Sequence, residues 1–240
     1  MDNDAAPKVR PSIEASATRF TDPSTFPQPA RSVVEKVFNF AKATLADDFT
    51  GITADGVPAD GLFPIVKTGV STEPIIDAAN AFRASLTAEQ WGDTTFDIDD
   101  VKAWRSWHNM HFNLMRHGLM LGDLDPAPRS AALNLIEASS SAAGYECARD
   151  IMKLNEHARE VTDNAEEFGE WYYWISIFGE PSLTEPWGWQ IDGHHLIVNC
   201  FIYGDQMVMT PDFRGSEPVF AKSGKYAGTH VFQDEQSLGL

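Results

Sequence analysis

Basic residues are scarce in this 240-residue chain: 18 lysines and arginines stand against 35 aspartates and glutamates, which gives a formal net charge of −17 at pH 7. The basic residues are scattered along the sequence and form no patch. Binding to nucleic acid or to an anionic membrane surface depends on clustered Lys and Arg side chains. We therefore expect neither nucleic acid nor membrane as a partner, and the acidity itself is typical of a soluble protein.

Cysteine is also rare. Cys147 and Cys200 are far apart and have apolar neighbours, which indicates reduced structural thiols and predicts a cytoplasmic location. The sequence has no run of about 18 apolar residues that could cross a membrane, and its N-terminus lacks the pattern of a secretory signal. The Gly-x-Ser-x-Gly, Walker and dinucleotide glycine motifs are absent, which argues against an elbow-type serine hydrolase, a P-loop enzyme and a nucleotide-dependent dehydrogenase.

The order of the sequence patterns predicts an α+β fold with a helical N-terminal half and a C-terminal half rich in antiparallel β-hairpins. Residues 1–30 are expected to form a mobile segment. The rest, 31–240, is expected to be a single domain with a helical layer over about 31–168 and a β-rich layer over about 169–240. Apolar periodicity predicts helices at 32–45, 73–86, 101–112, 129–140 and 145–161, with a capping box at 87–90 and a cap at Asp99 or Asp100.

Aromatic and β-branched residues predict strands at 171–178, 194–203 and 206–211. Gly204 stands first in the two-residue loop between the last two strands, which favours a type II′ turn. This register places Ile202 opposite Met207 and Cys200 opposite Met209.

The most informative stretch is Trp-Gly-Trp-Gln-Ile-Asp-Gly-His-His-Leu at 187–196. Imidazoles are the usual metal ligands and proton carriers near neutral pH, and indoles line many small-ligand sites. We therefore expect a site in which His195 is a general base or a metal ligand, while His194 or Asp192 orients it or shares the metal.

Strand geometry bears on the two histidines, because neighbouring residues of a strand point to opposite faces. If the strand starts at His194, that residue shares the apolar core face with Leu196, and His195 shares the more polar face with Asn199. Both imidazoles can serve one site only if the chain bends at Gly193, which glycine makes easy.

Four further side chains complete the expected site. Trp187 and Trp189 are expected to form an apolar wall, and Asn199 and Arg214 are expected to position a substrate, since arginine can clamp a carboxylate. A surface ion pair is an equally good interpretation of Arg214.

The cofactor is unknown from the sequence, with a divalent metal as the candidate. Its expected ligands are His194, His195 and Glu217, although their spacing matches no diagnostic zinc motif. For each histidine the alternative interpretation is a hydrogen-bonded packing residue. The remaining histidines carry less signal: His108 and His111 at i and i+3, and His157, are expected on helix surfaces, and Trp104 and Trp107 are expected in the core.

Several motifs together resemble the family called domain of unknown function 3500. The resemblance is carried first by residues 187–196, Gly204-Asp-Gln-Met-Val-Met-Thr-Pro211 and Gly215-Ser-Glu-Pro218. Supporting stretches lie at 62–65, 68–72, 86–90, 104–107, 150–155 and 169–171. The family brings no established reaction, and its members continue past the segments matching 224–229 and 234–236, so the resemblance implies a C-terminally truncated member.

Two classes of function stay open. The first is an enzyme of the hydrolase or lyase type that acts on a small organic molecule, because no redox-cofactor motif is present. The alternative is a non-catalytic module that binds a small ligand or a protein, with the Trp/His run serving a structural purpose. The expected partner is a small molecule in either case, and the oligomeric state is not predicted.

Overall fold

The computed structural model describes residues 30–51, 55–59, 61–62, 64–111 and 116–239. The expectation of a mobile segment at 1–30 thus falls almost entirely outside the described residues. The helices are α2 (Ala30–Ala46), α3 (Glu73–Ser85), α4 (Ala88–Thr94), α5 (Val101–Arg105), the 3₁₀ helix η2 (Leu121–Asp123), α6 (Pro126–Ala138), α7 (Ala142–Thr162) and α8 (Gln233–Leu238). The strands are β1 (Thr95–Phe96), β2 (Leu119–Met120), β3 (Tyr173–Phe178), β4 (Trp187–Gly193), β5 (Leu196–Tyr203), β6 (Gln206–Val208) and β7 (Asp212–Arg214).

One mixed sheet organises these elements. Its order is β1-β3-β4-β5-β6, with β2 also pairing with β3 and β7 also pairing with β5. The long strands β3, β4 and β5 pair antiparallel, and β1 is parallel to β3. Helices dominate the N-terminal half and strands the C-terminal half, which confirms the predicted α+β class.

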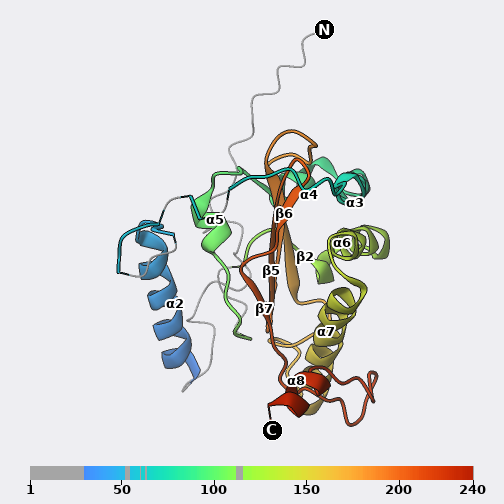
Figure 1. The fold of residues 1–240 in the computed structure, drawn as a ribbon. Coiled ribbons are helices and arrows are strands. Elements are labelled where there is room, and N and C mark those ends of the chain that lie inside the picture. Colours follow the sequence, from blue (N-terminus) through green and yellow to red (C-terminus); the bar gives the residue numbers. More distant parts are fainter. Residues whose placement is uncertain (1–29, 52–54, 60, 63, 112–115, 240) are drawn as a thin grey trace.

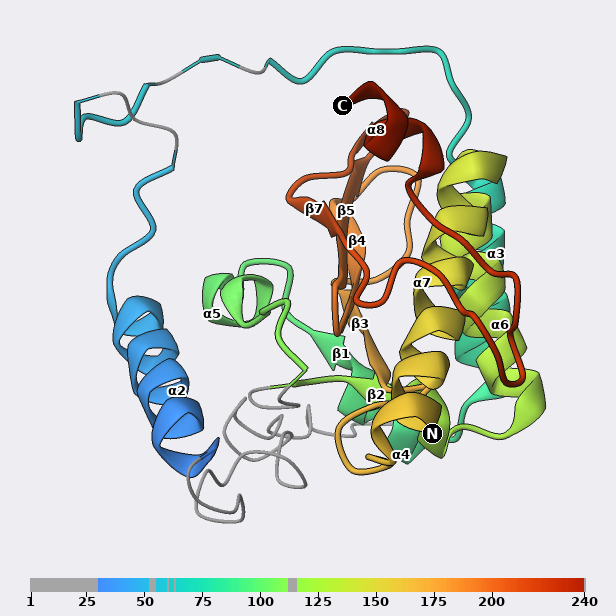
Figure 2. The same cartoon turned by 90° about the horizontal axis from the view of Figure 1, so that it is seen from below.

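The two faces of the sheet are covered differently (Figures 1 and 2). Helices α3, α6 and α7 lie along one face, whereas α5 lies on the other and α2 stands further out on that same side. The main core lies between the sheet and α3, α6 and α7. It receives alternate residues of β5, namely Leu196, Val198, Cys200 and Ile202. This alternation is the expected one for a strand with one face on the core, and it leaves Asn199 on the α5 side.

The chain turns between β4 and β5 at His194 and His195. Gly193 pairs with Leu196, so the two histidines form a two-residue hairpin loop. The prediction that the strand starts at His194 is wrong, because the bend at Gly193 ends β4 and the next strand begins at Leu196. Both imidazoles are therefore in one turn, which is the arrangement required for a shared site.

The second hairpin follows the sequence prediction only in its first half. Gly204 has φ of +60°, and Ile202 pairs with Met207 as expected. The strand then ends at Val208 instead of 211, and the backbone N–H of Asn199 donates to the carbonyl of Pro211. Met209 is thus outside the ladder, and Cys200 has its ladder partner in Trp189.

Local signals correctly locate the starts of α4 and α5, whereas α6 and α7 each begin three residues before their predicted starts. Thr87 and Gln90 form the predicted capping box, and the Asp100 side chain accepts from the backbone N–H of Ala103 at the start of α5. That helix ends at Arg105, however, so the predicted continuation to residue 112 is wrong. The guanidinium of Arg116 donates to the carbonyls of residues 108 and 110 and holds this segment outside the helix.

His157 is buried, with 4% of its surface exposed, although the sequence pattern predicts an exposed position. The returning C-terminal segment passes over α7 (Figure 2) and is held there by the bond from the Lys225 backbone N–H to a carboxylate oxygen of Glu160, three positions after His157. Within the part of the chain that the structure describes, no helix is long and apolar enough to span a membrane.

Candidate functional site

The His194-His195 turn is held by its neighbours. The backbone N–H of His195 donates to the carbonyl of Asn109 at 3.1 Å, and the N–H of Gly215 donates to the carbonyl of His195 at 2.8 Å. His195 has φ of +57°, the left-handed region that non-glycine residues adopt rarely and often at functional sites. The two ring centroids are 4.1 Å apart.

Asn155 of α7 fixes the protonation of His194. The amide nitrogen of Asn155 donates to the carbonyl of Gly169 at 2.8 Å, which turns its oxygen toward Nδ1 of His194 at 2.9 Å. That oxygen can only accept, so Nδ1 carries the proton and Nε2 is left with its lone pair. Nε2 has no hydrogen-bond partner among the described residues.

The surroundings keep the His194 ring neutral. The pKa of His194 is lowered to about 3, mainly by burial and to a lesser extent by the neighbouring His195 and His111 and by Arg116, whose positive charges would disfavour a charged ring. The Phe168 ring packs against it, with centroids 5.4 Å apart. At neutral pH His194 is therefore an unprotonated base.

His195 lies closer to solvent. Its Nε2 is 3.8 Å from a carboxylate oxygen of Glu217, whose side chain is 85% exposed. Burial lowers the pKa of His195, and the opposing attraction of Glu217 does not reverse that direction. A carboxylate so exposed is a weak electrostatic partner.

His111 completes a cluster that we call the histidine cluster: His111, His194 and His195. Its ring centroid lies 5.8 Å from that of His194, its ring stacks on Phe168 at 5.3 Å, and its Nδ1 lies 2.9 Å from a carboxylate oxygen of Glu167. The sequence prediction assigned His111 to a helix surface, which is wrong because residues 106–111 are not helical.

The expected metal site finds no direct support in this geometry. Among the described residues, no group of three or more His, Cys, Asp or Glu side chains is arranged to hold a metal ion. The set His194, His195 and Glu217 thus stays a prediction, although His195 and Glu217 do face each other.

Asp192 lies in β4, only two residues before His194, but its side chain does not point toward the histidine turn. It points to the α5 side of the sheet, where it forms an ion pair with Arg116, and both residues are nearly fully buried. Burial raises the pKa of Asp192 and the guanidinium of Arg116 opposes this. Asp192 therefore holds Arg116, and through it the segment at 108–110, instead of contacting either imidazole.

Trp187 and Trp189 lie in the main core. Both are fully buried, and Nε1 of Trp189 donates to the hydroxyl of Ser139 at 3.1 Å. The sequence prediction makes them the wall of a site, whereas the structure packs both against the helices α3, α6 and α7.

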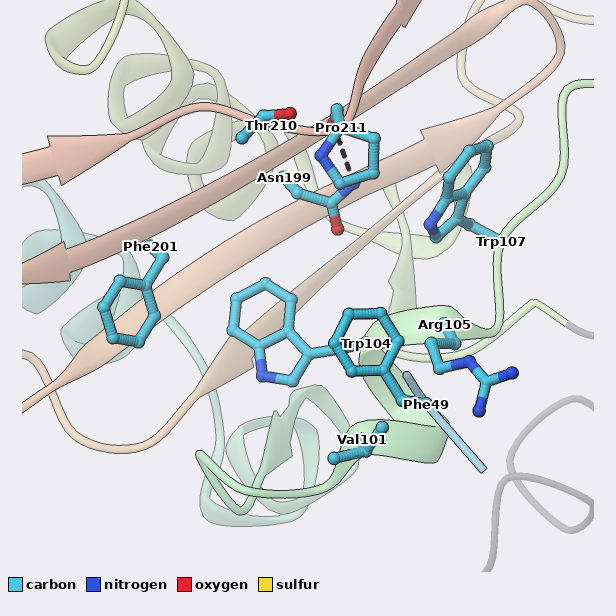
Figure 3. Close-up of a pocket in the computed structure, with 9 residues that line it drawn as sticks. All are labelled: Phe49, Val101, Trp104, Arg105, Trp107, Asn199, Phe201, Thr210 and Pro211. Atoms are coloured by element: carbon cyan, nitrogen blue, oxygen red, sulfur yellow. Dashed lines mark hydrogen bonds between the residues drawn. The ribbon is translucent and has the colours of Figure 1, made fainter. Parts of the chain in front are cut away.

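Arg214 and Asn199 are also apart from the histidine cluster. The guanidinium of Arg214 donates to the carboxylate of Asp212 and to the carbonyl of Gly144. It therefore forms an ion pair, which was the alternative interpretation of this residue in the sequence analysis. Asn199 lines a cavity of about 700 Å³ on the α5 side (Figure 3), together with Trp104 and Trp107. These two tryptophans were expected in the core, but they are only partly buried.

The sequence analysis did not assign three of these residues to the site: His111 of the histidine cluster, and Asn155 and Phe168, which contact His194. His111 was noted only for its spacing from His108, and Asn155 only as part of 150–155, one of the motifs of the resemblance.

Comparison with known proteins identifies the family of this chain but gives no activity, substrate or partner. No curated protein and no solved structure matches the chain significantly. The model of a family described as "Protein of unknown function (DUF3500)" matches residues 68–240. This match covers most of the chain, including every residue of the histidine cluster, and the chain belongs to the DUF3500 family.

Proposed function

We propose that the protein is an enzyme that acts on a small organic molecule by acid–base catalysis, with His194 as the general base. The observation that supports this is the hydrogen bond from Nδ1 of His194 to Asn155, because it leaves an unprotonated Nε2 on a neutral ring. Catalytic imidazoles are commonly oriented in this way by a partner on the other ring nitrogen.

The neighbouring groups suit proton transfer. In hydrolysis, Nε2 of His194 would take a proton from a water molecule as the oxygen of that water attacks the substrate; in elimination, it would take the proton of a substrate C–H bond as the bond to the leaving group breaks. The lowered pKa makes the ring a weak base, and for the same reason the imidazolium so formed would readily give its proton to the leaving group. His195 and His111, each beside a carboxylate, would hold the substrate's polar groups. Hydrolysis and elimination need only such proton transfers, so we propose a hydrolase or a lyase.

A screen for turnover tests this proposal. Purified protein is incubated with a panel of small esters, amides, lactones and hydroxy acids, and products are detected by mass spectrometry. We expect turnover that falls on the order of 100-fold in His194→Gln and is unchanged in His230→Gln, which alters a histidine outside the cluster. Full turnover by His194→Gln would contradict the proposal.

The pH profile gives a second readout. Because the pKa of His194 is lowered to about 3, we expect kcat/KM to stay level from about pH 8 down to about pH 5. A base with the ordinary histidine pKa would lose activity below about pH 6.5.

Three finer points belong to the same proposal. A divalent metal at His194, His195 and Glu217 is tested by elemental analysis of the protein beside the His194→Ala/His195→Ala variant: about one metal per chain, lost in the variant, would support it. We also propose a cytoplasmic location, which the two free thiols Cys147 and Cys200 support. The alternative, a non-catalytic binding module, predicts thermal stabilisation by a ligand without product.

A further inference from the structure

The cavity on the α5 side of the sheet is separate from the histidine cluster. It has a volume of about 700 Å³, within the range of about 300–1,000 Å³ that small-molecule sites occupy. It lies between α5 and β5, and no histidine is among the described residues that line it. Its apolar walls are Phe49, Val101, Trp104, Trp107, Phe201 and Pro211.

Aromatic faces make up much of these walls. The Trp104 ring stacks on Phe178 with centroids 3.7 Å apart and planes at 15°, so one face of the indole is covered and the other is left for the cavity. The Phe201 side chain comes from β5 and is 38% exposed. In the view of Figure 3, Trp104 lies between Phe201 and Trp107. Rings arranged in this way favour a planar aromatic ligand.

Two uncharged polar groups besides the hydroxyl of Thr210 belong to the lining of the same space. The carboxamide of Asn199 donates to the carbonyl of Pro211 at 2.9 Å, and its oxygen accepts from the amide of Gln190 at 2.6 Å, which uses one of two lone pairs. The indole N–H of Trp107 has no hydrogen bond to any described residue. In Figure 3 the Asn199 oxygen and the Trp107 nitrogen are both turned toward the cavity. Together they offer one acceptor and one donor.

Arg105, the charged residue that lines the cavity, already makes two hydrogen bonds within the protein. Arg105 donates from its two terminal nitrogens to the carbonyls of Asp47 at 2.7 Å and Thr44 at 2.8 Å, at the end of α2. No other ionisable side chain is among the described lining residues. Arg105 keeps its positive charge, but in Figure 3 its guanidinium points away from Asn199 and Trp107. A charged ligand group placed between Asn199 and Trp107 would therefore lose its hydration without gaining a charged partner.

We propose that this cavity binds an uncharged, planar aromatic molecule with one hydroxyl group, which donates to Asn199 and accepts from Trp107. The apolar walls supply most of the affinity and the two polar groups fix the orientation, as is usual for such sites. The site is independent of the proposed catalysis at His194.

Equilibrium dialysis with three probes tests the ligand class. We expect 2-naphthol to bind, naphthalene to bind several-fold more weakly, and 2-naphthoate to bind at least about tenfold more weakly than 2-naphthol. Failure of 2-naphthol to bind, or tightest binding of the carboxylate, would overturn the proposal.

Two variants locate the site. Trp107→Phe keeps an aromatic ring but removes the donor, so it should weaken 2-naphthol by about threefold to tenfold and leave naphthalene nearly unchanged. Phe201→Ala should weaken both by about tenfold. The matched control is Phe213→Ala, since Phe213 is 37% exposed on the same sheet but lies outside the cavity, near His195. Equal effects of Phe201→Ala and Phe213→Ala, or a loss with Phe213→Ala alone, would contradict this location.

Discussion

Arg116 and Asp192 form an ion pair in which both side chains are buried, at 1% and 3% exposure. The same guanidinium donates to the carbonyls of His108 and Met110, at 2.7 and 3.0 Å. Asp192 belongs to β4, so the pair connects the sheet to the segment that carries His111. The sequence suggests Asp192 as a catalytic partner of the histidines. In the structure its carboxylate is instead buried against Arg116, and the pair serves to hold two segments together.

Removing one partner of this pair should be strongly destabilising. Asp192→Ala leaves the Arg116 charge buried and uncompensated, which costs about 3–5 kcal/mol of unfolding free energy. Urea unfolding of Asp192→Ala, Arg116→Met and the double variant measures the coupling. A double variant that is less destabilised than the sum of the two single variants is the expected result, and simple additivity would show that the pair contributes no coupling.

Stability should fall on acidification through His194. Its folded-state pKa of about 3 lies below the unfolded value of about 6.5, so the contribution is complete above pH 6.5 and is lost as the pH falls toward 3. Between pH 7 and pH 5 this amounts to roughly 2 kcal/mol.

The His194→Gln variant isolates that contribution, because glutamine does not titrate. We expect its unfolding free energy to change by roughly 2 kcal/mol less than that of the wild type between pH 7 and pH 5. Identical pH dependence of the two proteins would mean that His194 titrates alike in the folded and unfolded states.

Trp187 should matter for stability and not for ligand binding. It is fully buried in the main core, so Trp187→Ala should cost about 3–5 kcal/mol. Trp189→Phe keeps most of the ring but loses the bond to Ser139, and should cost less. Chemical denaturation measures both. Weaker binding of 2-naphthol by a folded Trp187→Phe variant would contradict the proposal that the ligand binds in the cavity on the α5 side of the sheet.

Arg214 should likewise be dispensable for chemistry. Because its guanidinium bonds Asp212 and Gly144, Arg214→Ala should lower the melting temperature by a few degrees and leave the kcat of any turnover found in the screen unchanged. A large loss of kcat with an unchanged melting temperature would restore the substrate-positioning role expected from the sequence.

Periodicity predicts the parts of the fold that depend on one element at a time. The alternation along 196–202 correctly separates the core side chains from Asn199, and the Thr87 capping box needs only neighbouring residues. The end of α5 depends instead on Arg116, eleven positions after Arg105, and no local pattern contains that information.

The candidate site shows the same limit. The bend at Gly193 is one of two alternatives in the sequence, and only the structure decides between them. Asn155 is 39 residues from His194, so their contact depends on how α7 packs on the sheet. The buried Trp187 and Trp189 could not be distinguished from a ligand-site wall, because indoles serve both purposes.

The protonation state of His194 is the central point of the proposed function. Long-range ¹H–¹⁵N NMR spectra of ¹⁵N-histidine-labelled protein, recorded from about pH 8 to pH 5 and assigned with His194→Gln, report it directly. We predict a neutral ring protonated at Nδ1 throughout this range. A proton on Nε2, or a titration midpoint near pH 6.5, would contradict the account.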